Sequence, residues 1–355
     1  YPYAENESSS PDVWAMDVHS GAIEWQIEEA GNIITDMVVD PESSSLWLTA
    51  IVSFPERGRE SLDSTLIESQ VQAYDLDSGE WLSSTIIGPA GPGQGFVQGP
   101  QALLVDEGTV WVLAQDSEVL VGLDQQDMGE LTRLSIPGGP RSMIFHGEDL
   151  WIHACQEHMI HRVVDTTLSD TVQIPDDPRP DSIRRGHGHF NRPGESYGQN
   201  FSCNGCHYDG RGDTQVWRVS VFEVWEWSRP LMWLDGTSPL GWSGYVNDTR
   251  SFAYQGFTNI IAVWPSTDMA QDLVAFLSSL APPPKANGLT DRDGSLSPEA
   301  LVGKALYDGK AGCIGCHADG QKTSNESVDE GITGSRSSTP MLVGAYRHNA
   351  WLQDG

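Results

Sequence analysis

Basic residues are scarce in this chain. It carries 20 Lys and Arg against 50 Asp and Glu, which gives a formal net charge of −30. Such a surface would repel a phosphate backbone, so nucleic acid is excluded as a partner. The negative charge instead favours solubility, a salty habitat or attraction of a basic redox partner.

Long apolar runs and a starting methionine are also missing. No stretch approaches the ~20 consecutive apolar residues that a membrane-spanning helix needs, so no transmembrane segment is expected. No signal peptide is recognisable and the first residue is Tyr1, which leads us to expect a processed or truncated chain.

Cysteine is limited to five residues, and four of them belong to two short motifs that are described below. Only Cys155 remains, so no pair is left for a structural disulfide. Cys155 lies in the alternating apolar run LWIHAC, where a buried and inert thiol is expected rather than a nucleophile.

The chain is long and rich in tryptophan. Its 355 residues suggest two or three domains, each with its own core. Only 38% of the residues are hydrophobic, but thirteen of them are Trp, which argues for folded structure rather than disorder.

The first half of the sequence repeats itself. VWAMDVHSGAIEW resembles VQAYDLDSGEW, and both predict a strand, an Asp-x-x-Ser-Gly turn and a second strand. A second unit recurs three times, with two apolar runs around an acidic or glycine turn and with Trp47, Trp111 and Trp151 in register. Together these units predict three sets of four strands, at 33–87, 101–136 and 142–174. Half a set, at 13–27, precedes them.

Four short strands repeated every ~40–50 residues are the signature of a β-propeller blade. We therefore predict that residues 1–175 form an all-β partial β-propeller of about three and a half blades. The strand pairs around DLDSGE resemble the lactonase-type or YVTN-type propeller family. A β-sandwich of irregular hairpins is the alternative, which regular blade-length repetition disfavours. Since propellers close with at least four blades, upstream sequence or another chain is expected to complete it.

The second half changes character at 174–199, where the alternation stops and prolines with a charge cluster indicate a linker. Apolar spacing predicts a helix over 266–280, and a second helix over 297–310 has Ser297 as its N-cap and Pro298 in its first turn. We predict two mostly α, cytochrome c-like modules in tandem. They span 176–285 and 286–355, and the second is truncated.

The pattern Cys-x-x-Cys-His occurs at 203–207 and again at 313–317. In c-type cytochromes both Cys form thioethers with the haem vinyl groups, and the His ligates the iron. A thioredoxin-like redox pair would follow a strand in an α/β unit, and a Cys₄ zinc site would not require a His after each pair. We therefore predict two covalently bound haem c groups, held by Cys203, Cys206 and His207 and by Cys313, Cys316 and His317.

The context of both motifs resembles the bacterial di-haem cytochrome c peroxidases and the related MauG-type enzymes. IRRGHGHFN followed by SCNGCHYDGRGD resembles their first haem segment, in which a Gly-x-x-x-Phe helix precedes the motif. LSPEALVGKALYDGKAGCIGCHADG resembles their second haem module, and TPMLVGAYRHNAWLQDG resembles their segment from Thr-Pro to Asp-Gly. The resemblance covers about 174–355, half of the chain.

This resemblance implies that the haem on His207 is the low-potential, peroxidatic centre and that the haem on His317 is the electron-transfer centre. It implies a position between the haems for Trp242, for which core packing is the alternative. Asp268 is the nearest match for the acid that assists peroxide cleavage, although an Asp at a helix N-terminus is the commoner explanation.

The chain also departs from the family. Its Phe-His-Asp-Gly motif is replaced by 352–355, Leu-Gln-Asp-Gly, so the His is lost, and the sequence stops before the family's ligand to the second haem. The distal ligands stay open among His187, His189, Met232, Met269, Met341 and His348. The segment 291–299 resembles a calcium loop but is too short for an EF-hand, so a turn and helix cap is favoured. Ca²⁺ is a further expectation, because the family binds it between domains.

Peroxide reduction needs two electrons, and a second haem can store one of them. We therefore expect a peroxidase-type oxidoreductase, secreted to the periplasm or beyond, with a small cytochrome or cupredoxin as electron donor. The alternative is a non-enzymatic electron-transfer cytochrome whose propeller is a docking platform. A lactonase-like or quinone-binding propeller catalyst ranks last, because its blades have no evident cluster of metal ligands.

Overall fold

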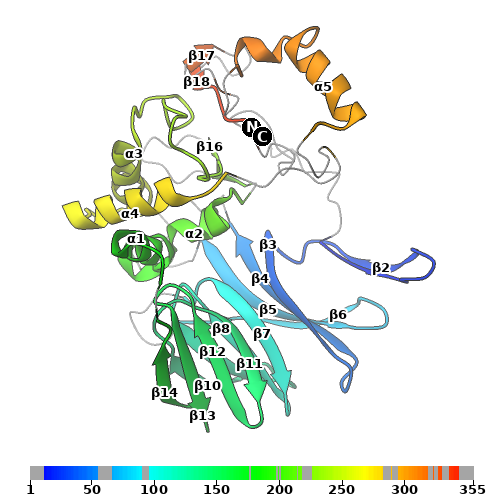
Figure 1. The fold of residues 1–355 in the computed structure, drawn as a ribbon. Helices are drawn as coiled ribbons and strands as arrows, with labels where there is room; N and C mark the ends of the chain where they lie inside the picture. The colour runs from blue at the N-terminus through cyan, green and yellow to red at the C-terminus, as the bar shows by residue number, and fades with distance from the viewer. Residues whose placement is uncertain are drawn as a thin grey trace. The chain divides into compact units, whose positions relative to one another are not determined.

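A computed structural model of the chain divides into two compact units (Figure 1). The first unit comprises Tyr1–Arg179 and Phe190–Gly205, and the second comprises Pro180–His189 and Cys206–Gly355. The structure describes residues 12–54, 66–89, 96–175, 177–196, 199, 201–213, 215–217, 226–282, 289, 295–318, 323, 327–329 and 336–343.

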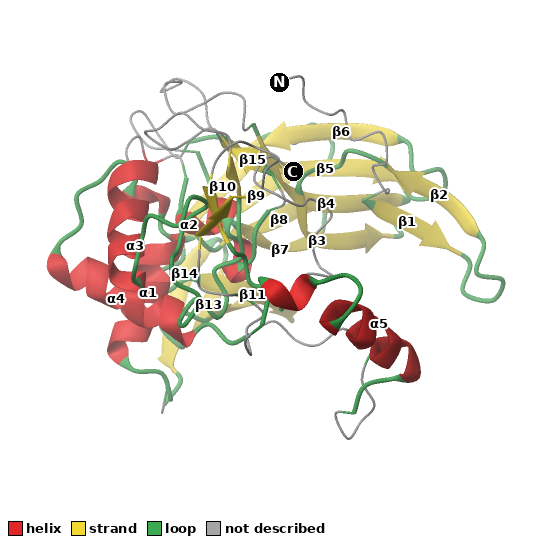
Figure 2. Cartoon of the chain, turned by 90° about the horizontal axis from the view of Figure 1, so that it is seen from above, coloured by secondary structure: helices red, strands yellow, loops and turns green. Residues whose placement is uncertain are grey.

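The first unit is built from three four-stranded antiparallel sheets and one hairpin, and within each sheet every strand pairs with the next along the chain (Figures 1 and 2). The hairpin is β1 (Val13–Met16) and β2 (Ile23–Ile27). The sheets are β3 (Ile33–Asp40), β4 (Ser45–Ser53), β5 (Ile67–Asp75) and β6 (Trp81–Ile86); β7 (Pro100–Asp106), β8 (Thr109–Ala114), β9 (Val119–Asp124) and β10 (Glu130–Ser135); and β11 (Pro140–His146), β12 (Asp149–Ala154), β13 (Met159–Val164) and β14 (Thr167–Gln173). The predicted strand sets are confirmed, and the chain is mostly β.

The sheets repeat in register as the sequence predicts. The second strand of each sheet carries one of the three repeated Trp residues, and these lie opposite Val38, Leu104 and Ile144 on the first strands. The first strands of neighbouring sheets contact each other, β3 with β7 and β7 with β11. This arrangement is consistent with a partial β-propeller, whose blades place their first strands together.

Consecutive sheets pack face to face, because alternate residues of a strand point to opposite faces. On β8, Val112 faces the first sheet and Leu113 faces the third. The hairpin β1–β2 covers Leu46 and Leu48 of the first sheet in the same way. Both faces of the second sheet are therefore buried, which explains why its strands are continuous apolar runs.

The Asp-x-x-Ser-Gly turns form as predicted. The Asp75 carboxylate accepts hydrogen bonds from the backbone of Ser78 at 2.8 Å and of Asp77 at 3.2 Å. Gly79 follows with a φ of 73°, in the left-handed region that glycine occupies without a steric penalty. Asp17 and Gly21 form the same turn in the hairpin.

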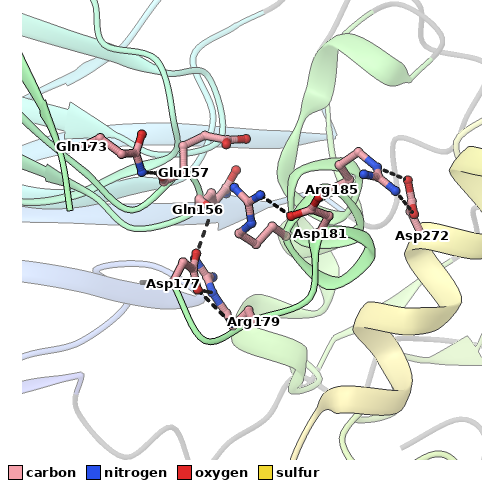
Figure 3. Close-up of polar contacts among 9 residues, drawn as sticks. Gln156, Glu157, Gln173, Asp177, Arg179, Asp181, Arg185 and Asp272 are labelled. Carbon is pink, nitrogen blue, oxygen red and sulfur yellow. Dashed lines mark hydrogen bonds and ion pairs between the residues drawn. The ribbon is translucent and has the colours of Figure 1, made fainter. Parts of the chain in front are cut away.

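The linker after the third sheet is fastened to that sheet by Arg179. Its guanidinium donates a hydrogen bond of 2.7 Å to the carbonyl oxygen of Cys155 and one of 3.1 Å to that of Gln156, the second of which can be followed in Figure 3. It also pairs with Asp177 at 2.8 Å, which holds the pKa of that carboxyl well below its usual range.

The second unit combines helices with short two-stranded sheets. Its longer helices are α1 (Asp181–Asn191, whose last two residues belong to the first unit), α3 (Thr249–Gln255) with a π turn at Gly256–Ile260, α4 (Thr267–Ser279) and α5 (Pro298–Asp308). Its short elements are the 3₁₀ turns Tyr208–Gly210 and Cys313–Gly315, and the strand pairs β15 (Val216–Trp217) with β16 (Glu226–Trp227) and β17 (Ser327–Asp329) with β18 (Arg336–Ser338). The 3₁₀ turn Pro193–Glu195 and α2 (Cys203–Cys206) lie in the part of the first unit that ends at Gly205, apart from Cys206 itself.

Two of these helices confirm the predicted ones. Ser266 caps α4 by accepting a hydrogen bond from the backbone of Met269, and Ser297 caps α5 by accepting one from Ala300. The assignment of the second half to two haem modules, and the predicted boundaries at 176 and 286, stay predictions.

Candidate functional site

The first Cys-x-x-Cys-His motif forms a single helical turn. Cys203 and Cys206 are the two ends of α2, and His207 follows as the cap of the next 3₁₀ turn, with φ −120° and ψ 51°. Both cysteine side chains are partly buried, and neither forms a disulfide. The turn therefore presents two thiols three residues apart with an imidazole directly after them, which is the donor set of a haem c attachment site.

His207 itself fits an axial ligand. Its Nδ1 atom is buried and has no hydrogen-bond partner in the described part of the chain. Burial lowers the pKa of His207 to about 4, while an interaction with the Arg229 backbone acts in the opposite direction. The imidazole is therefore neutral at neutral pH, and neutral imidazole is the form that binds a metal.

A buried carboxyl supports the loop behind this motif. Asp213 is 3% exposed, and its backbone N–H donates to the carbonyl oxygen of Cys206 at 3.0 Å. Its carboxyl accepts hydrogen bonds from Trp217 Nε1 at 2.9 Å and from the Ser228 hydroxyl. Burial raises the pKa of Asp213 to about 7, well above that of an exposed Asp. The sequence analysis missed this residue, because its partner Ser228 lies far along the chain.

Trp242 lies in a buried aromatic cluster of the second unit. It is 5% exposed, its Nε1 donates to the carbonyl oxygen of Trp227 at 2.7 Å, and the two rings are 6.1 Å apart. The central carbon of the Arg229 guanidinium lies over the Trp242 ring, 3.6 Å from its centroid. The Trp242 carbonyl accepts a hydrogen bond of 2.6 Å from Ser338. Trp242 thus links the segment that contacts His207 to β18.

The second motif is a 3₁₀ turn at the end of α5. The backbone N–H of His317 donates to the Cys313 carbonyl at 3.0 Å, so the His lies one turn after the first Cys. Tyr307 of α5 donates its hydroxyl to the His317 carbonyl. The Cys316 side chain is exposed and that of Cys313 is partly buried, and neither forms a disulfide.

Apolar side chains are uncovered around this second motif. On α5, Leu301 is 54% exposed, Val302 63% and Leu306 50%, and Ile314 inside the motif is 40% exposed. No residue of α5 is buried. A haem bound at Cys313 and Cys316 is a large apolar group, so these residues fit a module that packs around it.

The other predicted residues are dispersed. Asp268 is exposed in the first turn of α4, where the helix dipole stabilises an acidic residue. Met232 Cγ lies 3.5 Å from the Cβ position of Gly210, three residues after the first motif. His187 stacks on Phe276 at 4.8 Å, and His189 lies 4.0 Å from Asp272.

The remaining candidates give no ligand set. Met269 and Met341 are partly buried, and His348 and 352–355 lie outside the described residues, as do 291–294 of the calcium-like segment. Within the described ranges, no three His, Cys, Asp or Glu side chains gather to hold a metal ion. No helix there is both long and apolar enough to cross a membrane.

No family model and no curated protein matches this chain. Among solved structures, it is similar to hydrazine synthase of Kuenenia stuttgartiensis, with 16% identity and a TM-score of 0.44 over 50% of this chain and 75% of that one. It is also similar to BamB of Moraxella catarrhalis, with 16% identity and a TM-score of 0.30 over 43% and 41% of the chains. A streptogramin B lyase is similar as well, with 14% identity and a TM-score of 0.33 over 46% of this chain and 47% of that one. Similarities at this level assign no function.

Proposed function

We propose that this chain is a di-haem c-type cytochrome that reduces peroxide. Cys203 and Cys206 would attach the first haem with His207 as its ligand, and Cys313, Cys316 and His317 would hold the second. The observation that carries the proposal is the pair of Cys-x-x-Cys-His turns, in which both thiols are outside disulfides and the first His has a buried, unpartnered Nδ1.

Haem supplies an iron that can bind peroxide and exchange single electrons. The chain would supply axial ligation by His207, and the burial around that residue would keep water from its proximal side. Reduction of one peroxide to two waters takes two electrons and two protons, so the site on His317 would hold one of the electrons. Asp213 would keep the loop after Cys206 in place through its backbone hydrogen bond.

Trp242 would lie on the route of electrons between the two sites. The proposal is supported by its contacts, which run from Arg229, beside His207, through the indole ring to Ser338. A packed aromatic ring couples two centres better than a gap of the same length would, because the intervening atoms are in contact.

A second candidate is an electron-transfer cytochrome in which both irons have two protein ligands. It is favoured by Met232, which lies near Gly210, three residues after the first motif, and by the exposed position of Asp268 at the start of α4. In both candidates the donor would be a small cytochrome or cupredoxin with a basic surface, which the net charge of −30 would attract.

One set of measurements tests the proposal. Mass spectrometry of the denatured chain should show two haem additions, and Cys203→Ala with Cys206→Ala should leave one. Absorption and EPR spectra should then show a first iron that responds to peroxide. Zero or one haem in the unaltered chain refutes the di-haem assignment. Two haems that are six-coordinate in every redox state and ignore peroxide establish the carrier instead.

We further propose that other sequence completes the propeller, either in a longer form of the chain or in a second chain. Apolar residues are exposed on both end sheets, Ile144 at 66% and Val172 at 55% on one and Met37 at 55% and Val39 at 51% on the other. Attachment of haem c takes place outside the cytoplasm, so we also propose a periplasmic or extracellular location. Fractionation of cells and the native mass of the purified assembly test these two points.

A further inference from the structure

A buried carboxylate holds the two neighbours of Cys203, and all of these residues belong to the first unit. Asp116 lies in the turn between β8 and β9 and is 3% exposed. It accepts a hydrogen bond from the Ser202 hydroxyl at 3.0 Å and from Asn204 Nδ2 at 3.3 and 3.2 Å. Ser202 and Asn204 are the two neighbours of Cys203, and each is 2% exposed. Asp116 thus binds both sides of the first thioether residue.

The backbone of the second sheet is arranged to admit this carboxylate. Gly99, with a φ of 67°, precedes β7, and a Cβ there would lie 2.4 Å from Asp116 Cγ. The third sheet has the same arrangement, because a Cβ on Gly139 would lie 2.3 Å from Gln156 Cδ. Pro100 pairs with Ala114 as Pro140 pairs with Ala154, so Asp116 and Gln156 hold equivalent positions. Gln156 shows that an uncharged side chain can fill this position of the turn. A charged residue, Asp116, occupies it in the sheet that binds the neighbours of Cys203.

A second contact fixes the same turn. The Ile67 side chain of β5 packs against Gly205, since its Cδ1 lies 2.5 Å from the Cβ position of that glycine. The segment before the turn is held as well, since Gln115 donates to Asn191 at 3.2 Å. The two residues between the cysteines are therefore buried within the first unit rather than exposed in a loop.

We propose that Asp116 is a positioning residue for the first haem, an inference that rests on the proposed haem attachment at Cys203 and Cys206. Both carboxylate oxygens accept hydrogen bonds, which is the role of an ionised carboxylate. A buried negative charge next to the attachment turn stabilises the oxidised, more positive state of the iron. The first unit thereby sets both the orientation of the turn and the reduction potential of the first haem, and it is more than a docking platform.

The test compares Asp116→Asn with Asp106→Asn in the full chain carrying both haems. Asp106 is an exposed residue of the same sheet, so the control makes the same change of charge away from the motif. A redox titration should show a positive shift of the first midpoint potential in Asp116→Asn, while the second potential, an internal reference, stays in place. The double variant Asp116→Asn with Asn204→Asp returns a carboxylate and a donor to the pair, and it should restore most of the original value.

Three outcomes decide the inference. A shift in Asp116→Asn no larger than that in Asp106→Asn overturns it, and so does a double variant that shifts as far as the single one. If Asp116→Asn does not fold, Ser202→Ala removes one hydrogen bond without a change of charge, and an unmoved first potential there overturns the inference. Absence of haem from Cys203 and Cys206 in the unaltered chain refutes the proposed function, and the inference with it, before any variant is compared.

Discussion

The Arg229 guanidinium lies 3.6 Å from the centroid of the Trp242 ring, and both of its terminal nitrogens donate to Ser338, at 2.8 and 3.1 Å. The cation and the indole are thus held in one geometry by a third residue. A cation over an aromatic face is stabilised by about 0.5–2 kcal/mol, depending on how far the pair is removed from water. This pair ties β18 to the segment beside His207.

From this contact we predict that Trp242→Phe slows electron transfer between the two proposed haems. The substitution removes the hydrogen bond of 2.7 Å to the Trp227 carbonyl and shortens the ring, so coupling falls and the free energy of unfolding decreases by about 1–2 kcal/mol. Stopped-flow reduction of each haem measures the rate. Trp264→Phe is the control, because Trp264 is 78% exposed. Equal rates in both variants would exclude Trp242 from the route.

The second prediction separates the roles of the two sites. On the proposed function, His207→Ala should abolish peroxide turnover while the second haem still accepts an electron, because the iron proposed to bind peroxide would lose its ligand. His317→Ala should leave peroxide binding in the spectrum and stop sustained turnover. Turnover that survives His207→Ala but not His317→Ala would reverse the assignment of the two haems.

A third prediction concerns the crossing of α1 and α4. A Cβ on Gly186 would lie 1.9 Å from the backbone carbonyl oxygen of Asp272. Next to this contact, Arg185 forms an ion pair with the Asp272 carboxylate at 2.7 Å (Figure 3). Gly186→Ala should therefore destabilise the second unit by about 3 kcal/mol, because two helix backbones must separate.

Gly303 provides the matched control for that substitution. It lies inside α5 with nothing within 4 Å of its Cβ position, so Gly303→Ala should stabilise the helix by about 0.5–1 kcal/mol. Urea unfolding followed by far-UV circular dichroism measures both changes. A loss of stability in Gly303→Ala equal to that in Gly186→Ala would show that the clash at Asp272 is not the cause.

The regular parts of the fold were predictable, because their signals are local. Alternation with Trp47, Trp111 and Trp151 located the strands, and Ser297 marked the start of α5 within a few residues. These features depend on neighbours two to four positions away. The Cys-x-x-Cys-His turns are local in the same way, because their spacing is contained in five residues.

The supports of the site were not predictable, because their partners are distant in sequence. Asp116 meets Asn204 across 88 residues, and Asp213 meets Ser228 across 15. In the sequence these Asp residues lie in polar turn-like segments, where an exposed acid is expected. Only tertiary packing reveals that they are buried, and so the carboxylates that matter most were hidden among 50 acidic residues.

The last prediction concerns the pH dependence that Asp213 introduces. Its pKa rises from 3.8 in the unfolded chain to about 7 in the folded one, because burial disfavours the charged form. Protonation of Asp213 therefore stabilises the folded state relative to the unfolded one. Its contribution is fully present below about pH 4 and is lost as the pH rises through about 7. The unaltered chain should accordingly lose stability over this range relative to Asp213→Asn, which cannot ionise.

The measurement is the difference in the free energy of unfolding between the two proteins at several pH values, since all other acids cancel in it. Asp235→Asn is the control, because Asp235 is exposed in the same unit and its side chain can keep accepting from Thr249 as an amide. The difference for Asp213→Asn should change by about 1–3 kcal/mol between pH 4 and pH 7, and Asp235→Asn shows what the same substitution does at an exposed position. A flat difference for Asp213→Asn would mean that the buried carboxyl stays ionised, held by Trp217, Ser228 and the backbone of Gln215.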